Sequence, residues 1–234
     1  MDIFVFKQTI RKMKQIFLSI TVVSFMAFGL QSCKDGNKEA ETETMDSAAE
    51  LPNITADFSV DTEASVIEWE GYKPLKTHNG TIDIASGSVL VNNGEIEQAK
   101  FAIDMNSIEV LDLEGKGKEN LQNHLIGTAE GKETDFFNAT EYPFSTFLLN
   151  KVFEKDGNTM MGGDLTIKDI THYVEFPATV TLEDNDLEIA SEPFKLDRTK
   201  WGLNFKSKSV FDNLGDNFVS DDMQIKVKLV AKRS

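Results

Sequence analysis

The sequence LQNHLIGTAEGKETDFFNATEYPFSTF, residues 121–147, interrupts a series of short alternating segments that lies on both sides of it. Five aromatic rings fall within twelve residues of this stretch: Phe136, Phe137, Tyr142, Phe144 and Phe147. Burying a ring stabilises a fold by about 1.5–3 kcal/mol, so these rings favour the interior. Irregular backbone inside a core would leave amides unpaired. We therefore expect a lid, a loop folded over one end of a β structure with its rings pointing inward.

The segments around this stretch alternate with a period of two. Ile67 and Trp69 share one side of their segment. Glu68 and Glu70 lie on the other side, and we expect both to face solvent. A second segment places four apolar side chains on one face: Ala99, Phe101, Ile103 and Met105. This pattern is typical of strands that have one apolar face.

Turn signals such as Asn93-Gly94 and Asp156-Gly157 separate the alternating segments and indicate antiparallel neighbours. We predict eight strands, near residues 57–71, 80–91, 95–108, 144–154, 159–168, 173–182, 187–196 and 221–232. A short helix is expected over 118–126, and the long connections 109–141 and 198–219 should sit together at one end. Period-two alternation fits both an open sandwich and a closed barrel.

The first 32 residues are expected to be a lipoprotein signal peptide rather than part of the fold. The apolar run 16–30 is short for a spanning helix and ends at the chain's only cysteine, Cys33. A transmembrane anchor is the alternative. Leu30-Gln31-Ser32-Cys33 resembles a bacterial lipobox, whose cysteine is acylated, and Lys34-Asp35 resembles the export signal of surface lipoproteins in Bacteroidetes. Acyl chains on Cys33 would anchor the protein stably to a membrane.

Residues 33–53 are rich in acidic and small residues and predict a flexible acidic tether, which leaves 54–234 as one domain. The chain has a formal net charge of −15, and removing residues 1–32 takes away four bases and one acid to leave −18. Nucleic acid and anionic bilayer surfaces need a basic patch on their partner. The charge therefore argues against both classes of partner.

No motif in the chain predicts catalysis. The three histidines, His78, His124 and His172, lie in separate segments without close pairing, which favours histidines at the rim of the fold. A metal site built from all three is the alternative. The sequence has neither a Gly-x-Ser-x-Gly elbow nor a phosphate-binding glycine loop. We expect no enzyme activity, no catalytic residues, no metal and no cofactor.

Several motifs, taken in order, resemble the YceI-like family of exported lipocalin-like barrels. They run from about residue 66 to 232 and comprise His78-Asn79-Gly80, residues 103–108, His124-Leu125, Asp135-Phe136-Phe137, Tyr142-Pro143 with Phe147, residues 163–167, residues 197–202 and residues 220–222. One departure is the stretch 127–134, which is longer than the spacer in the family. The resemblance implies an all-β fold, an eight-stranded antiparallel barrel with a short helix and a lid.

The resemblance also implies that the barrel binds an isoprenoid chain, of polyprenyl or quinone type, in its interior. The residues expected to bind it are Trp69, His78, Phe101, Ile103, Met105, His124, Phe136, Phe147 and Ile167. His78 would contact a polar head group, and Trp201, in the closing connection, should sit at a rim. The expected protein is a lipid carrier of the cell envelope, an outer-membrane lipoprotein facing the periplasm or the cell surface.

Inward apolar side chains fit a filled core as well as a lipid slot, because every barrel has them. Two other functions therefore stay open. One is a surface-displayed structural or adhesion module with a filled core, and the other is a metal-dependent hydrolase. A homodimer is also consistent with the sequence.

Overall fold

The computed structural model describes residues 55–234. The predicted signal peptide, the predicted lipidation site Cys33 and the predicted acidic tether, residues 33–53, lie outside the described residues. The structure consists of twelve strand segments, with the bounds β1 (Thr55–Val60), β2 (Val66–Lys73), β3 (Lys76–Ile82), β4 (Ile84–Asn92), β5 (Glu95–Asp104), β6 (Glu109–Val110), β7 (Phe144–Lys155), β8 (Asn158–Ile167), β9 (Ile170–Glu183), β10 (Asp186–Ser191), β11 (Phe194–Asp197) and β12 (Asp222–Arg233).

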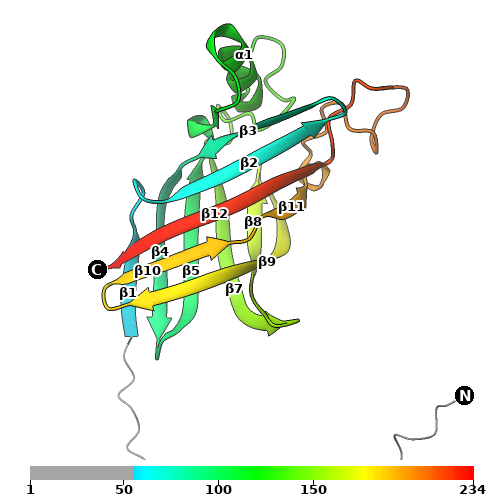
Figure 1. The fold of residues 1–234 in the computed structure, drawn as a ribbon. Helices are drawn as coiled ribbons and strands as arrows, with labels where there is room; N and C mark the ends of the chain where they lie inside the picture. The colour runs from blue at the N-terminus through cyan, green and yellow to red at the C-terminus, as the bar shows by residue number, and fades with distance from the viewer. Residues whose placement is uncertain (1–54) are drawn as a thin grey trace, which may run out of the picture. The chain divides into compact units, whose positions relative to one another are not determined.

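The sheet closes on itself (Figure 1). Eight strands pair in the order β1-β4-β5-β7-β8-β9-β10-β12, and β12 pairs again with β1. The other four segments extend these strands: β2 continues β1, β3 precedes β4, β6 follows β5 and β11 follows β10. The twelve segments therefore form eight barrel strands, four of them interrupted, all antiparallel and close to the predicted ranges. The predicted eight-stranded barrel is confirmed.

Short turns link neighbouring strands at one end of the barrel. Asn93, Gly94, Asp156, Gly157 and Asp184 all have positive φ there, as tight hairpin turns require. We call this the closed end, because Phe58, Leu187 and Ala231 are each 0% exposed and fill the barrel near it. The first described residue and the C-terminus also lie at this end. We call the opposite end, which carries the long connections, the open end.

The open end carries α1 (Gly115–Ile126), the only α-helix among residues 55–234. It spans the predicted helical segment and begins three residues earlier. Gly127 ends it with φ 91°, and a Cβ at this position would lie 2.6 Å from the carbonyl oxygen of Glu133. Glycine is therefore required where the chain leaves the helix. No helix among the described residues is long and apolar enough to cross a membrane.

The lid prediction is partly wrong. Residues 121–126 belong to α1, so only residues 127–143 form an irregular connection. Phe136 and Phe147 are buried, but Phe144 is 54% exposed. Phe144 is the first residue of β7, and strand alternation points it outward because Ser145 and Phe147 point inward. The number of aromatic rings in residues 121–147 did not show where the lid ends and where strand β7 begins.

Candidate ligand cavity

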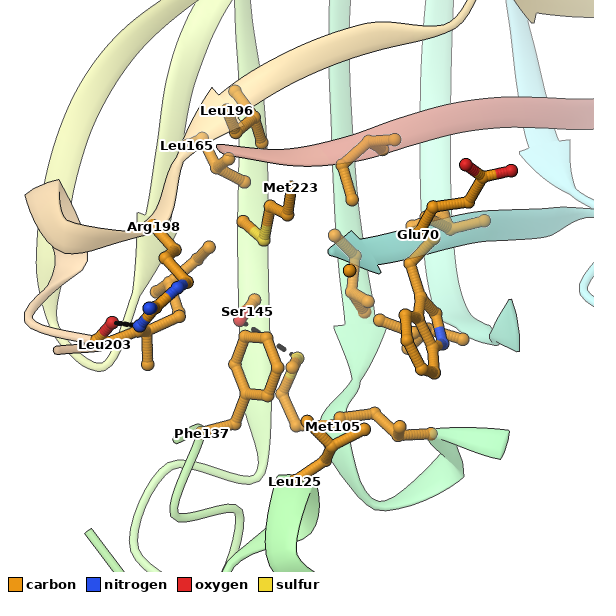
Figure 2. Close-up of a pocket in the computed structure, with 18 of the residues that line it drawn as sticks. Glu70, Met105, Leu125, Phe137, Ser145, Leu165, Leu196, Arg198, Leu203 and Met223 are labelled. Carbon is orange, nitrogen blue, oxygen red and sulfur yellow. Dashed lines mark hydrogen bonds between the residues drawn. The ribbon is translucent and has the colours of Figure 1, made fainter. Parts of the chain in front are cut away.

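An apolar cavity of about 210 Å³ lies inside the barrel towards its open end (Figure 2). This exceeds the roughly 150 Å³ of an engineered apolar cavity that admits benzene. Every strand segment other than β1 and β6 contributes lining residues, as do α1 and the connection after β11. The lining is almost wholly hydrocarbon and aromatic. An elongated apolar molecule suits such a space better than a charged one.

All nine residues predicted to bind ligand line this cavity: Trp69, His78, Phe101, Ile103, Met105, His124, Phe136, Phe147 and Ile167. Their role as ligand contacts stays a prediction. Rings pack against one another along one wall, with Phe101 and Phe147 stacked at 6.3 Å and Phe176 and Phe194 stacked at 4.6 Å between centroids. The wall is therefore preformed and stiff.

Two residues that line the cavity have polar groups that the backbone does not satisfy. The Nε1 atom of Trp69 is fully buried, out of contact with the cavity space, and has no hydrogen-bond partner. The hydroxyl of Ser145, which is 3% exposed, donates to the Sδ atom of Met105 at 3.1 Å (Figure 2). A thioether is a weak acceptor. A ligand acceptor in the cavity would therefore offer the Ser145 hydroxyl a better partner.

Gly80 allows the indole of Trp69 to lie flat against the neighbouring strand. The two residues are paired in register between β2 and β3. A Cβ on Gly80 would lie 2.8 Å from Cζ2 of Trp69 and would overlap the carbonyl oxygen of Glu109. The glycine of the His78-Asn79-Gly80 motif is thus a packing requirement, which strand alternation alone does not reveal.

Two sequence-based expectations near the cavity are wrong. Trp201 is not at an exposed rim: it is 1% exposed, and its Nε1 donates to the carbonyl of Leu165 at 3.1 Å. The closing connection folds inward there, because burial of the large indole is favourable once its N–H has a partner. Glu70 is half-buried rather than solvated, and it accepts a hydrogen bond of 2.8 Å from the hydroxyl of Tyr72. Glu68 is exposed, as expected.

The lid contacts the closing connection through aromatic rings. His124 of α1 packs edge-on against Phe136 at 5.0 Å and against Phe205 at 4.8 Å between centroids. Nε2 of His124 lies 2.7 Å from Oδ2 of Asp135. The two long connections therefore sit together at the open end, as predicted. His124 is held by a carboxylate and two rings while it lines the cavity.

His78 lies at the cavity mouth and is held by Asp112. Nδ1 of His78 is 2.8 Å from Oδ2 of Asp112, whose other oxygen accepts the backbone N–H of Asn79 at 3.1 Å. Burial opposes ionisation of Asp112, but these two hydrogen bonds outweigh it and hold the pKa of the carboxyl below its usual value. His78 is thus fixed in orientation at the mouth.

The histidines do not come together. His172 lies 2.9 Å from the carbonyl oxygen of Lys200 and packs edge-on against Trp201. His78 and His124 have separate carboxylate partners. Within residues 55–234, no three His, Cys, Asp or Glu side chains are arranged to hold a metal ion. The alternative of a site built from all three histidines therefore finds no geometric support.

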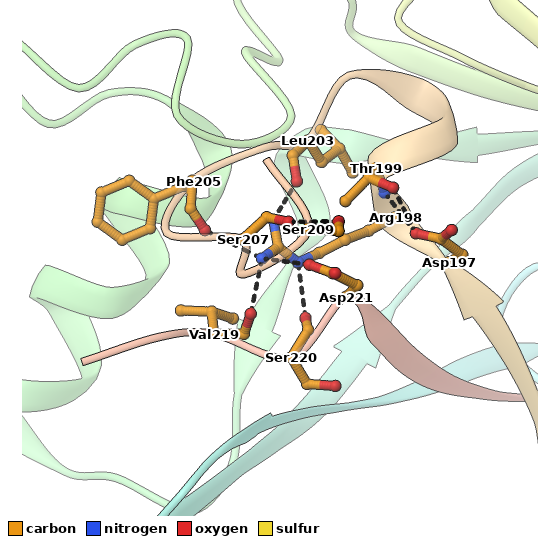
Figure 3. Close-up of polar contacts among 10 residues, drawn as sticks. All are labelled: Asp197, Arg198, Thr199, Leu203, Phe205, Ser207, Ser209, Val219, Ser220 and Asp221. Atoms are coloured by element: carbon orange, nitrogen blue, oxygen red, sulfur yellow. Dashed lines mark hydrogen bonds and ion pairs between the residues drawn. The ribbon is translucent and has the colours of Figure 1, made fainter. Parts of the chain in front are cut away.

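Arg198 organises the closing connection at the open end (Figure 3). It is 4% exposed, and its guanidinium donates to the carbonyl oxygens of Leu203, Phe205, Val219 and Ser220. The carboxylate of Asp221 lies 3.8 Å from it. One buried cation thus gathers both ends of the connection 203–221. This residue belongs to a motif quoted above, but its role requires contacts that the sequence does not show.

Sequence reasoning missed other lining residues on the second half of the barrel. Phe176, Phe194, Met223 and Ile225 line the cavity. Alternation along β9, β11 and β12 could have identified them, since each lies on the apolar parity of its strand.

Comparison with known proteins agrees with this architecture. A family model described as the YceI-like domain matches residues 58–231. Among solved structures, Burkholderia cenocepacia BcnA is 22% identical with a TM-score of 0.56, and the alignment covers 73% of this chain and 98% of that one. A polyisoprenoid binding domain from Saccharophagus degradans, implicated in plant cell wall breakdown, is 13% identical with a TM-score of 0.53, covering 76% and 98%. These similarities concern the fold. No curated protein matches the sequence.

Proposed function

This chain belongs to the YceI-like domain family, and from that premise we propose that it binds an isoprenoid chain inside its barrel and carries or stores it. The observation that supports the proposal best is the apolar cavity, which opens at one end and is lined by stiff aromatic walls. One relative of the same fold is described as a polyisoprenoid binding domain. Each buried CH₂ contributes about 0.8 kcal/mol, so a chain of several isoprene units is held by area alone.

The cavity favours a carrier over the filled-core alternative. A structural module would gain stability by packing the open half of the barrel as tightly as the closed half, where Phe58 and Leu187 leave no exposed surface. Instead Ile103, Val174 and Ile225 are only half-buried although they point inward. An unfilled apolar space costs stability, and a bound chain would recover it.

Ser145 is the polar contact that we assign to the ligand. Its hydroxyl can exchange the weak thioether acceptor for a better one, such as a carbonyl or ether oxygen of a prenyl lipid. Trp69 lines the same cavity with its indole ring and would contact the hydrocarbon chain. The buried cation Arg198 is already occupied by carbonyl oxygens and Asp221, so it does not call for an anionic ligand.

We expect the emission of Trp69 to change saturably when delipidated protein is titrated with a prenyl quinone. Ligand entry replaces the empty space beside the indole ring with hydrocarbon. The Trp69→Phe variant should lose most of this signal while its fold survives, because one ring replaces another at a cost of about 1–2 kcal/mol. Solvent extraction and mass spectrometry of freshly purified protein should in addition identify a bound isoprenoid.

Trp201→Phe is the control, because Trp201 is buried outside the cavity lining. It should lower stability through loss of the hydrogen bond to Leu165 but leave the titration signal in place. Absence of any saturable response, together with an extract that contains no isoprenoid, would contradict the carrier proposal and favour the structural or adhesion module.

We also propose that the protein is a membrane-tethered lipoprotein of the cell envelope, anchored by acylation of Cys33. The motif Leu30-Gln31-Ser32-Cys33 supports this proposal. Metabolic labelling with palmitate should mark the wild type and not Cys33→Ala, since the chain has no other cysteine. Equal labelling of both proteins, or of neither, would show that the lipobox interpretation is wrong.

A further inference from the structure

The open end of the barrel carries two exposed apolar tips. The first is Leu75, which is 95% exposed in the turn between β2 and β3. The second is the pair Val210 and Phe211, which are 48% and 49% exposed in the connection between η2 (Arg198–Trp201) and β12. We call Leu75, and the pair Val210 and Phe211, the two apolar tips. No packing within residues 55–234 accounts for a leucine held so fully in solvent at a hairpin turn.

The two tips belong to one rim. The backbone N–H of Ser220, in the closing connection, donates to the carbonyl of Tyr72 at the end of β2 at 2.8 Å. The hairpin and the connection project at the same end of the barrel (Figure 1). Tyr72, Lys73, Phe205 and Val219 beside the tips line the cavity. The apolar tips therefore lie next to residues that line the cavity.

Lysines accompany both tips. Lys73 and Lys76 are paired across the hairpin on either side of Leu75. Lys206 and Lys208 precede Val210, and all four lysines are exposed. Lys208 Nζ lies 3.6 Å from the ring centroid of Phe218, and Lys206 Nζ lies 5.5 Å from that of Phe205.

Acidic groups near the tips are Asp212 and Asp216 in the same connection, and Asp112, which is paired with His78. Glu70, bonded to Tyr72, and Asp221, beside Arg198, are also close. Residues 72–77 and 206–218 together carry four lysines and two aspartates, in a chain with a net charge of −15. The overall charge argues against an anionic bilayer as partner, but in these two segments lysines outnumber aspartates, and the other three acids each have a partner within the fold.

We propose that the open end docks on a lipid bilayer, with Leu75, Val210 and Phe211 inserted among the acyl chains and the four lysines at the anionic head groups. Apolar side chains beside lysines are the composition that binds membrane interfaces. Thr55, the first described residue, lies at the closed end, away from this rim. Docking over the mouth would let an apolar chain pass from the bilayer into the cavity without crossing water. The docking itself does not depend on which cargo the barrel holds.

The test is flotation with phosphatidylcholine vesicles that contain about a third phosphatidylglycerol. The protein is residues 51–234, which lacks Cys33, so acylation cannot contribute. This segment forms a compact unit that contains the whole closed sheet and its core. We expect the wild type to float with these vesicles. The double variant Leu75→Ser with Phe211→Ser should lose at least tenfold in partitioning, and each of Lys73→Gln and Lys76→Gln about fivefold.

The matched control is Leu148→Ser with Tyr173→Ser, which removes one aliphatic side chain that is 49% exposed and one aromatic side chain that is 46% exposed from the outer wall of the barrel. It should float like the wild type. If the tip variant also floats like the wild type, or the wall variant loses binding equally, the docking proposal is wrong. A protein that ignores vesicles but forms a dimer disrupted by the tip variant would assign the tips to a second copy instead.

Lipid content separates this inference from the proposed function. Tip variants keep the cavity, and lipid extracted from them and from the wild type is measured in parallel. Flotation without any bound isoprenoid would refute the carrier while docking stands. Bound isoprenoid in a protein that never floats would refute docking while the carrier stands.

Discussion

Replacing Val174 with tryptophan should abolish isoprenoid binding and leave the barrel folded. Val174 lies on β9, points into the cavity and is only half-buried, so an indole at this position has space to enter. The added ring would occupy the volume that a prenyl chain needs. We expect at least a hundredfold loss of affinity, with a stability change of no more than the roughly 1–3 kcal/mol typical of overpacking. Titration of delipidated protein and mass spectrometry of extracts measure the loss.

Tyr173→Trp is the matched control, since this neighbouring side chain on β9 faces outward and is 46% exposed. It introduces the same indole without reaching the cavity, and it should bind lipid as the wild type does. Undiminished binding by Val174→Trp, with an intact circular dichroism spectrum, would place the ligand elsewhere and refute the interior site.

Replacing Arg198 with methionine should lower the free energy of unfolding by about 3–5 kcal/mol, the usual consequence of removing one member of a buried ionic group. The change leaves four carbonyl oxygens of the closing connection and the Asp221 carboxylate without their shared partner. Because this connection includes Phe205, which packs on the lid, the open end should loosen along with the loss of stability. Urea denaturation measures the change in the free energy of unfolding.

Hydrogen exchange of the amides in residues 203–221 measures the loosening of the open end. Arg198→Lys keeps the charge but offers a single ammonium in place of the planar fork, so it should recover only part of the loss. Lys195→Met is the control. Lys195 is exposed and lies 3.7 Å from Asp222, an exposed pair whose removal should change stability by less than about 1 kcal/mol. Similar stability of Arg198→Met and Lys195→Met would refute the organising role of Arg198.

Strand alternation alone predicted that part of the binding set faces the interior. Phe101, Ile103 and Met105 repeat every second residue, and a closed sheet requires such a face to point inward. Their alternating positions therefore predict that all three lie in the interior. The exposure of Phe144 follows from the same alternation once this residue is assigned to the strand and not to the lid. The half-burial of Glu70 depends on tertiary contacts, because Glu70 lines the cavity and accepts a hydrogen bond from Tyr72.

Strand alternation could not predict the positions of residues in the long connections. Trp201 and Arg198 lie in a segment without periodicity, so nothing in the spacing indicated that one would be buried against Leu165 and the other would hold four carbonyl oxygens. Such roles arise when segments that are distant in sequence fold over the same end of the barrel. The rim of lysines and apolar tips is of the same kind, because the β2–β3 hairpin and the closing connection meet, through Tyr72 and Ser220, only in the folded chain.

The sequence by itself determined the eight strands, their turns, the short helix and the apolar interior, since alternation and turn chemistry act between near neighbours along the chain. Only the tertiary structure decided that the sheet closes, that one half of the interior is filled and the other is hollow, and that Trp69 keeps a free N–H inside. These features depend on ring closure between β1 and β12 and on how side chains from many strands fill a shared volume. This packing depends on the volumes of side chains that come from opposite sides of the barrel, and no local pattern along the chain predicts it.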